Sequence, residues 1–246
     1  MKRISSISCL TVGKYWAEDI AEVFEISSVD IGLHFSLTTL PPLIISKTYS
    51  SPHDVLFDLL TSRLSKESIE LEFELQWNTF VLKCGRVPDF VDGHHHIHQL
   101  PIIRDVITDF LKNKKVMTYM RVCSFKLEKP YLSKINIKKY VISFFSYHLK
   151  KQCTFKNIFT NKSFDGVVYV SAKYNYKSSF EKLLNSVDDG LLIMTHPGYC
   201  DKVLLGLDSY SLERESELSY LKSNEFMSTL LQKNIKILPL REAIKT

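Results

Sequence analysis

Residues 90–98 read FVDGHHHIH, in which two apolar residues are followed by a carboxylate and then by a histidine-rich run. Such an apolar start is typical of a buried strand. In parallel α/β folds, the residues that follow a buried strand lie at the edge of the sheet where ligands bind. If the strand runs over Phe90–His98, its period of two places Asp92, His94, His96 and His98 on one face. The segment therefore predicts a strand with a polar cluster at its carboxyl end.

On both sides of this segment, short apolar runs alternate with helical patterns. The further strands expected are Ser28–Leu37, Val116–Cys123, Gly166–Ser171, Gly190–Thr195 and Ile235–Leu238. The helices expected are Asp54–Leu64, Ser65–Leu82, Pro101–Lys112, Lys134–Lys151, Ser178–Asn185, Ser211–Leu221 and Glu225–Gln232. Strands that alternate with helices predict an α/β fold with a mostly parallel sheet. At 246 residues, a doubly wound sheet and a barrel are both open.

The composition is that of an ordinary globular protein, with 45% hydrophobic and 24% charged residues. This excludes a disordered chain, a collagen-like chain and a disulfide scaffold. The net charge is +5, but the basic residues form no dense block, so nucleic acid is not an expected partner. No apolar run is long enough for a membrane helix, and the first residues are too polar for a secretory signal. The five cysteines form no C-x-x-C pair, which favours a reduced, cytoplasmic protein without a cysteine zinc site.

The histidine-rich run suits a divalent metal, because two histidines and a carboxylate form a known open-site pattern. The H-E-x-x-H metalloprotease pattern is absent, since position 95 is His95. A polar loop is the alternative interpretation. His196 follows an expected strand and precedes Pro197-Gly198, a position that favours a catalytic role. His34 lies in an apolar stretch, where a histidine is more often a core residue than a ligand. The chain has no P-loop, no G-x-G-x-x-G motif and no G-x-S-x-G nucleophile motif.

Three stretches together resemble the YdjC-like (ChbG/HpnK) carbohydrate deacetylases. They are residues 32–38 (GLHFSLT), 88–101 (PDFVDGHHHIHQLP) and 194–199 (MTHPGY). A fourth similarity is the C-terminal series formed by Tyr210, Arg214, Glu217-Leu218, Leu221 and Ser223. The resemblance runs from about Ile4 to the C-terminus in the family's order, so it is more specific than any single motif.

The resemblance implies a distorted (β/α) barrel, a divalent metal that is often magnesium, and hydrolytic removal of N-acetyl groups from amino sugars. By position, His34 and His94 are the implied metal ligands. Asp92 is implied to hold a neighbouring imidazole in place. His196 is the implied general acid that protonates the leaving amine. Arg121 is implied to contact the carbohydrate substrate.

The family opens with a strand that ends in Asn-Ala-Asp-Asp-Phe-Gly, which supplies a third metal ligand and the catalytic base. This chain has no such motif, and its residues 3–8 resemble the family's second strand. We therefore expect one domain over residues 1–246 that lacks the first strand and helix. Three explanations are open, namely a start codon assigned too late, a decayed gene, and a non-catalytic glycan-binding or scaffolding relative.

The missing strand has two further consequences. Two neutral histidines hold Mg²⁺ poorly because hard cations prefer oxygen ligands, whereas Zn²⁺ suits imidazole. An unpaired sheet edge where the first strand should lie favours a homo-oligomer.

Overall fold

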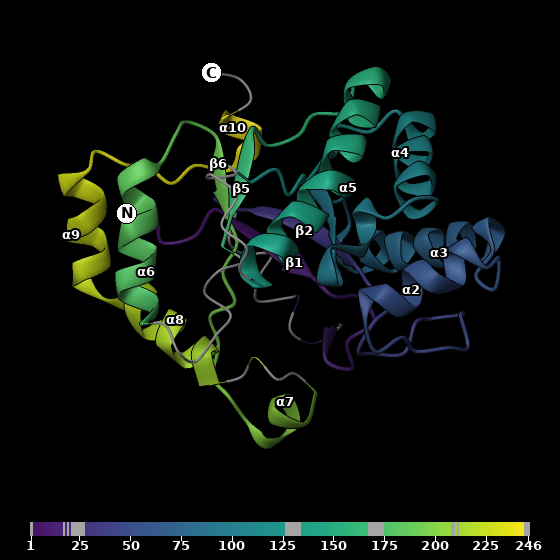
Figure 1. The fold of residues 1–246 in the computed structure, drawn as a ribbon, viewed down its shortest axis with the longest axis horizontal. Coiled ribbons are helices and arrows are strands. Elements are labelled where there is room, and N and C mark those ends of the chain that lie inside the picture. The colour runs from purple at the N-terminus through teal and green to yellow at the C-terminus, as the bar shows by residue number, and fades with distance from the viewer. Residues whose placement is uncertain are drawn as a thin grey trace.

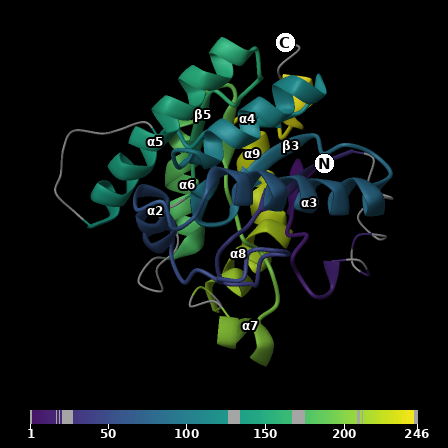
Figure 2. The same cartoon turned by 90° about the vertical axis from the view of Figure 1, so that its right-hand side faces the viewer.

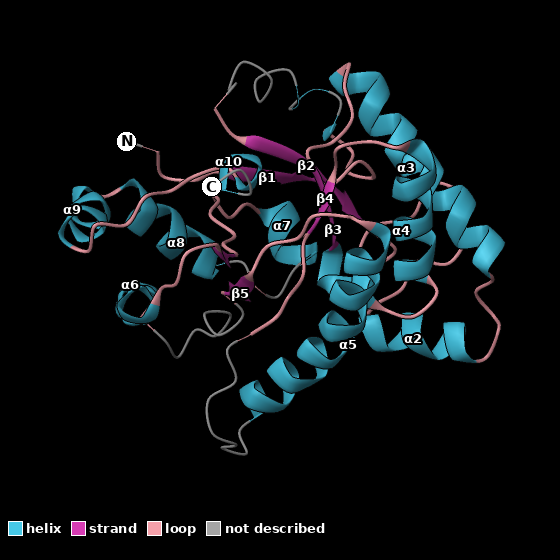
Figure 3. Cartoon of the chain, turned by 90° about the horizontal axis from the view of Figure 1, so that it is seen from above, coloured by secondary structure: helices cyan, strands magenta, loops and turns pink. Residues whose placement is uncertain are grey.

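The computed structural model describes residues 2–16, 18, 20, 28–125, 134–166, 175–207, 210 and 212–243. Its strands lie between two groups of helices (Figure 1). The larger group is formed by α2 (Pro52–Leu60), α3 (Lys66–Cys84), α4 (Ile103–Lys114) and α5 (Lys134–Lys156). The smaller group, on the other side of the strands, is formed by α6 (Tyr176–Leu183), α8 (Leu212–Lys222) and α9 (Asn224–Gln232). Seen from above, the two groups again lie on opposite sides of the strands (Figure 3).

Four parallel strands form the main sheet in the order in which they occur along the chain. They are β1 (Ser6–Cys9), β2 (Asp30–Phe35), β3 (Phe90–Gly93) and β4 (Tyr119–Met120). A second parallel pair is formed by β5 (Ser163–Asp165) and β6 (Leu191–Ile193). Backbone hydrogen bonds link the two sheets: Met120 N–H donates to the Phe159 carbonyl at 2.9 Å, and Phe164 N–H donates to the Ser124 carbonyl at 2.9 Å. The strands thus follow one another in chain order, as in a (β/α) barrel.

The remaining elements are short. They are the 3₁₀-helices η1 (His94–Gln99) and η3 (Leu184–Ser186) and the helices α7 (Lys202–Leu207) and α10 (Leu240–Ala243). In Figure 2, α3, α4 and α5 face the viewer and α7 lies at the bottom, away from them. In the described part of the chain, every helix is too short or too polar to span a bilayer.

The helix α3 shows how local sequence sets the element boundaries. The Ser65 hydroxyl accepts a hydrogen bond from Ser68 N–H and so caps the first turn. Gly85 ends the helix in the left-handed conformation, with φ of 61°, which glycine adopts without a Cβ clash. Ser51 caps α2 in the same way by accepting from Asp54 N–H.

The main core lies between the four-stranded sheet and α3. Leu33 and Phe35 of β2 and Val91 of β3 are fully buried, as are Phe73 and Phe80 of α3. Strands covered on both faces are typical of parallel sheets in α/β proteins. A second apolar cluster fills the space among α6, α8 and α9. The prediction of an α/β fold with a parallel sheet is confirmed.

Three of the expected strands differ from the structure, and the one expected over Phe90–His98 already ends at Gly93. The strand expected over Ile235–Leu238 is wrong, because this segment is irregular. Ile235 and Ile237 instead pack against the helical cluster of α6, α8 and α9, which buries them without strand pairing. The strand expected over Val116–Cys123 is reduced to β4, and the chain beyond it runs beside residues 159–164. Of the strand expected over Gly166–Ser171, residues 167–171 lie outside the described residues, and β5 ends just before it.

Gly32 allows β2 and β3 to approach, and this gives a first prediction. A Cβ built at Gly32 would lie 2.4 Å from three atoms of the Phe90 ring, which stacks on Tyr119 at 5.3 Å. We expect Gly32→Ala to lower the free energy of unfolding by about 1–3 kcal/mol, as overpacked core substitutions do. Urea unfolding measures this loss. Gly206→Ala is the matched control, because nothing lies within 4 Å of its Cβ. Equal stability of the two variants would contradict the prediction.

Candidate functional site

The candidate site lies at the carboxyl ends of β2, β3 and β4. His34 and Asp92 are direct partners in the register between β2 and β3. Side chains at paired positions of neighbouring parallel strands point to the same face of the sheet. Arg121 follows β4 immediately, and its backbone N–H donates to the Val91 carbonyl at 3.1 Å. The strand register alone therefore brings these three side chains together.

Asp92 is the centre of this cluster and is only 1% exposed. Its Oδ1 lies 2.6 Å from His34 Nδ1 and accepts a hydrogen bond from the Ser8 hydroxyl at 2.5 Å. Its Oδ2 forms an ion pair with Arg121 Nη1 at 2.6 Å. With Nδ1–H of His34 directed at the carboxylate, the lone pair of the neutral ring is on Nε2. This is the arrangement in which a carboxylate orients a metal-binding histidine.

Electrostatics keep Asp92 ionised in spite of its burial. Burial by itself raises the pKa of a carboxyl group, because it disfavours the charged form. The charge of Arg121 and the contacts with His34 and Ser8 outweigh this and hold the pKa of Asp92 well below its usual range. Asp92 is therefore a carboxylate at neutral pH that is already paired within the protein.

His94 approaches His34 from the turn that follows β3. The two imidazole rings meet edge to face, with centroids 5.7 Å apart. His94 Nδ1 lies 2.8 Å from the Thr38 hydroxyl, so a polar group orients this ring as well. The two implied metal ligands are thus neighbours.

The expectation that Asp92, His94, His96 and His98 share one face of a strand is wrong. The strand ends at Gly93, and the histidines that follow form the 3₁₀-helix η1. His95 and His96 adopt positive φ angles of 51° and 61°, which break the alternation of side chains. The histidines consequently separate into different environments instead of forming one cluster.

Two of these histidines face Arg121. His96 Nδ1 lies 3.2 Å from Arg121 Nη2. His98 Nε2–H donates to the Arg121 carbonyl at 2.9 Å, and the His98 ring is fully buried. Burial, together with the charge of Arg121, lowers the pKa of His98 to about 3. Neutral His98 is therefore part of the scaffold that holds Arg121.

The pKa of His98 predicts a loss of stability in acid. A histidine in the unfolded chain has a pKa of about 6.5, so the stability that neutral His98 provides is complete above that pH. It declines from there toward pH 3, because only the unfolded chain then binds the proton. Between pH 7.5 and pH 5, His98 should remove about 2 kcal/mol from the free energy of unfolding. Urea unfolding of the wild type and of His98→Gln at both pH values measures this difference.

The variant His53→Gln controls for the loss of a histidine, because His53 is exposed. It should keep the pH dependence of the wild type. Burial also lowers the pKa of His96, but His96 is present in all three proteins, so its contribution cancels from the comparison. A pH dependence as steep in His98→Gln as in the wild type would show that His98 accepts a proton in the folded state.

His196 lies on the loop after β6, in a separate set of contacts. Its backbone N–H donates to Glu217 Oε2 of α8 at 2.6 Å, and its ring meets the Tyr210 ring edge-on at 5.6 Å. The Tyr210 hydroxyl donates to the other oxygen of Glu217. Burial raises the pKa of Glu217, which is 2% exposed. Tyr210 and Glu217, which the C-terminal motif includes, thus hold the histidine loop.

The structure brings together four of the five residues singled out from the sequence, namely His34, Asp92, His94 and Arg121. His196 has its own partners, and its catalytic role stays a prediction. So does substrate contact by Arg121, whose side chain is 6% exposed and also reaches the Gly93 carbonyl at 3.2 Å. Sequence reasoning missed Ser8 and Thr38. Each is a hydroxyl residue beside or within an expected strand, a pattern shared by many residues without a role in a site.

The donor set fits a metal only in part. His34 and His94 supply imidazole nitrogen, which suits borderline ions such as Zn²⁺ better than Mg²⁺. Among the residues that the structure describes, no three histidine, cysteine, aspartate or glutamate side chains come close enough to hold a metal. Asp92 is engaged by His34, Ser8 and Arg121. The described residues therefore do not form a complete magnesium site.

Two curated proteins are similar to this chain over most of its length. A carbohydrate deacetylase of Clostridium beijerinckii is 27% identical over 229 residues, which cover 89% of this chain and 80% of the relative. A chitooligosaccharide deacetylase of Yersinia pestis is 25% identical over 232 residues, which cover 89% of this chain and 81% of the relative.

The fold also has a counterpart among solved structures. The crystal structure of a putative cellobiose-phosphate cleavage protein from Enterococcus faecalis superposes with a TM-score of 0.69 at 18% identity. The superposition covers 97% of this chain and 87% of that protein. Residues 1–232 match the family described as YdjC-like protein. The chain therefore belongs to the YdjC-like protein family.

Proposed function

We propose that this protein binds N-acetylated amino sugars at the carboxyl edge of its sheet and removes their acetyl groups by hydrolysis. The observation that supports this most directly is the convergence of His34, Asp92 and Arg121 in a chain whose relatives are named carbohydrate deacetylases. A buried, ionised carboxylate that orients an imidazole is a common feature of hydrolytic sites.

The residues have distinct tasks in this proposal. Asp92 and Ser8 fix the ring of His34, and Thr38 fixes the ring of His94. The imidazole pair faces the acetamide. If a divalent ion such as Zn²⁺ were bound, His34 and His94 would supply two of its ligands, and the ion would polarise the acetamide carbonyl. Water adds to the acetamide carbonyl carbon, and His196 donates a proton to the amine as the C–N bond breaks and acetate forms. Arg121 positions Asp92 by ion pairing.

Acetate release from N-acetylated chitooligosaccharides tests this proposal. The assay uses the full chain with EDTA, Mg²⁺ or Zn²⁺, together with direct calorimetry of sugar binding. We expect release that His94→Ala abolishes and that His53→Ala, an exposed histidine elsewhere, leaves unchanged. Sugar binding with no acetate release under any metal condition would overturn the catalytic proposal.

A second candidate is a glycan-binding protein without catalysis. It is favoured by one observation, the lack of a third metal-ligating side chain near His34 and His94 among the described residues. This candidate predicts that sugar binding survives the double substitution of His94 and His196 by alanine. Loss of binding in that double variant would argue against it.

A further inference from the structure

The helix α5 exposes a stripe of apolar side chains to solvent. Its members are between 48% and 81% exposed and are Ile137, Val141, Phe144, Tyr147 and Phe155. Successive members are three or four residues apart, with Lys151 filling the place between the last two, so they lie on one face of the helix. Contiguous apolar surface of this kind on a globular protein usually marks an interaction site.

The other face of α5 packs against the protein core. Leu149 and Cys153 on that face are fully buried and belong to the main apolar cluster. The helix is therefore held in place by the fold, and its exposed stripe is presented without any further folding. In Figure 3, α5 lies at the outer edge of the larger helix group, where a flat surface can approach it.

The stripe continues past the end of α5. The ring of Phe155 lies 5.9 Å from Lys112 Nζ, at the end of α4. Lys112 lines a groove together with Lys115, Met117 and Phe159. Met117 is 83% exposed and Phe159 is 52% exposed, so this groove adds two more apolar side chains with lysines beside them. We call the stripe and this continuation the α5 surface.

The α5 surface carries charge of one sign. The sequence of α5 includes six lysines and no aspartate or glutamate. Lys151 lies within the stripe and is exposed, as are Lys112 and Lys115 at its end. Asp109 of α4, which contacts α5, is paired with Lys156 at 2.8 Å. The surface therefore presents apolar side chains among cations.

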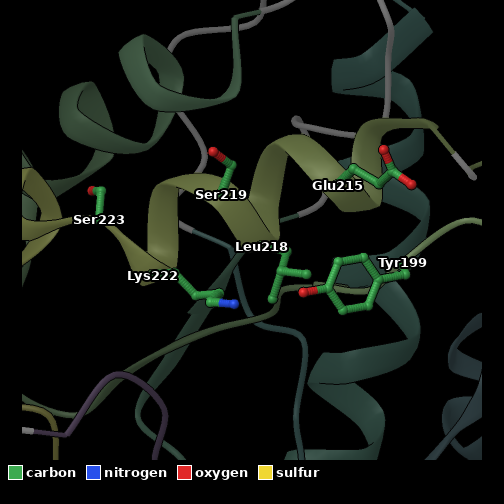
Figure 4. Close-up of a pocket in the computed structure, with 6 residues that line it drawn as sticks. All are labelled: Tyr199, Glu215, Leu218, Ser219, Lys222 and Ser223. Atoms are coloured by element: carbon green, nitrogen blue, oxygen red, sulfur yellow. The ribbon is translucent and has the colours of Figure 1, made fainter.

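Two other exposed features of the structure have mixed charge instead. The helix α3 exposes Leu71 and Leu82, but its sequence includes four glutamates and two lysines. The groove on α8 is lined by both an acid and a cation, Glu215 and Lys222, on either side of Leu218 (Figure 4). Neither feature selects a partner by the sign of its charge, whereas the α5 surface selects an anionic one.

We propose that the α5 surface binds the face of an anionic lipid bilayer. Phenylalanine and other apolar side chains with lysines around them are typical of helices that lie in the plane of a membrane interface. The apolar stripe enters the boundary between headgroups and acyl chains, and the lysines contact the lipid phosphates. A second copy of the chain fits this surface less well, because two α5 helices side by side bring lysines together with no acid on either helix.

This inference goes beyond the proposed function and does not depend on it. Met117 and Phe159 precede β4 and β5, so this part of the α5 surface lies at the amino ends of the strands. The candidate site lies at their carboxyl ends. Lipid binding can therefore be measured, and can fail, whether or not the protein releases acetate.

Sedimentation with lipid vesicles tests the proposal. The full chain is mixed with vesicles of phosphatidylcholine alone, or of equal parts phosphatidylcholine and phosphatidylserine. We expect binding to the mixed vesicles that added salt weakens, because salt screens the attraction between lysines and headgroups. Folded wild type that does not sediment with the mixed vesicles would overturn the proposal.

Substitutions then locate the binding surface. Phe144→Ala combined with Phe155→Ala should weaken binding to the mixed vesicles about tenfold or more, since two aromatic rings no longer enter the interface. The matched control is Leu71→Ala combined with Leu82→Ala. These leucines are 59% and 81% exposed, compared with 60% and 81% for the two phenylalanines. The control should bind like the wild type, and equal losses in the two double variants would overturn the proposal.

The lysines are tested in the same assay. Lys112→Gln combined with Lys151→Gln should weaken binding about fivefold for each lysine. Lys83→Gln combined with Lys222→Gln removes the same charge elsewhere and should have a smaller effect. All of these side chains are exposed, so the variants should keep the urea unfolding of the wild type. A dimer that Phe144→Ala dissociates, found together with no vesicle binding, would show that a second copy covers α5 and would overturn the lipid proposal.

Discussion

Replacement of Asp92 by alanine should lower the free energy of unfolding by about 3–5 kcal/mol, the usual cost of removing one partner of a buried ion pair. Asp92 is 1% exposed and Arg121 is 5% exposed, so water cannot replace the lost carboxylate. The guanidinium also contacts the Gly93 carbonyl, His96, the Met194 sulfur and the ring of Phe164, which lies 5.6 Å away. None of them carries a negative charge. The variant therefore leaves a buried cation without a counter-ion.

A double substitution distinguishes the effect of losing the ion pair from the effect of losing the volume of the Asp92 side chain. Asp92→Ala combined with Arg121→Met removes both charges and should recover part of the lost stability, because apolar pairs often replace buried ion pairs without penalty. Asp105→Ala is the control, since Asp105 pairs with Arg104 at 3.6 Å and its side chain is 43% exposed. Exposed ion pairs of this kind contribute little to the free energy of unfolding. A loss for Asp92→Ala no larger than that of the control, measured by urea unfolding, would contradict the prediction.

The elements with a clear local signal could be predicted from the sequence. The apolar spacing within residues 65–82, together with Gly85, predicted α3 to within a few residues of its end. The apolar run before His34 predicted β2, and the register between β2 and β3 pairs His34 with Asp92 near the carboxyl ends of these strands. These features depend on periodicity and on turn chemistry, which are properties of short segments.

The predictions that failed concern parts of the structure that depend on contacts between segments far apart in the sequence. The left-handed turn at His95 and His96 contains no glycine or asparagine, so nothing in the local sequence indicates it. It forms where Arg121, from the next strand, meets the ring of His96. Ile235 and Ile237 form a short apolar run that could equally be a strand or a segment covered by helices. Ser8 becomes significant only because the register of β1 and β2 places it beside His34.

The C-terminal motif shows a different limit of prediction from the sequence. Tyr210 and Glu217 were recognised as a pattern, but the sequence did not say what they do. The structure gives them a physical task, because both oxygens of Glu217 are used, one by the His196 backbone and one by the Tyr210 hydroxyl. A residue pattern was therefore visible from the sequence, whereas its function in holding the loop required coordinates.

If the protein is a deacetylase, substitution of His196 by alanine should lower kcat by about 10²–10⁴-fold, the usual contribution of a general acid or base. The nitrogen that leaves during acetamide hydrolysis is a poor leaving group until it is protonated. A neighbouring imidazolium supplies that proton near neutral pH, because the ordinary pKa of histidine lies close to it. Asp92 cannot do this, since the charge of Arg121 helps to keep it ionised.

The structure makes this substitution a clean test. The loop is held through the backbone N–H groups of residues 196, 198 and 200, and none of these bonds uses the imidazole. His196→Ala loses the edge-on contact with the Tyr210 ring but keeps these backbone bonds, so the loop and the fold should be retained while kcat falls. Glu217→Gln, which weakens the bonds to His196 and Tyr210, should change kcat and KM together because the loop loses its anchor. Acetate release measured over a range of chitooligosaccharide concentrations separates the two effects. An unchanged kcat in folded His196→Ala would show that His196 has a structural task only, and that another group protonates the amine.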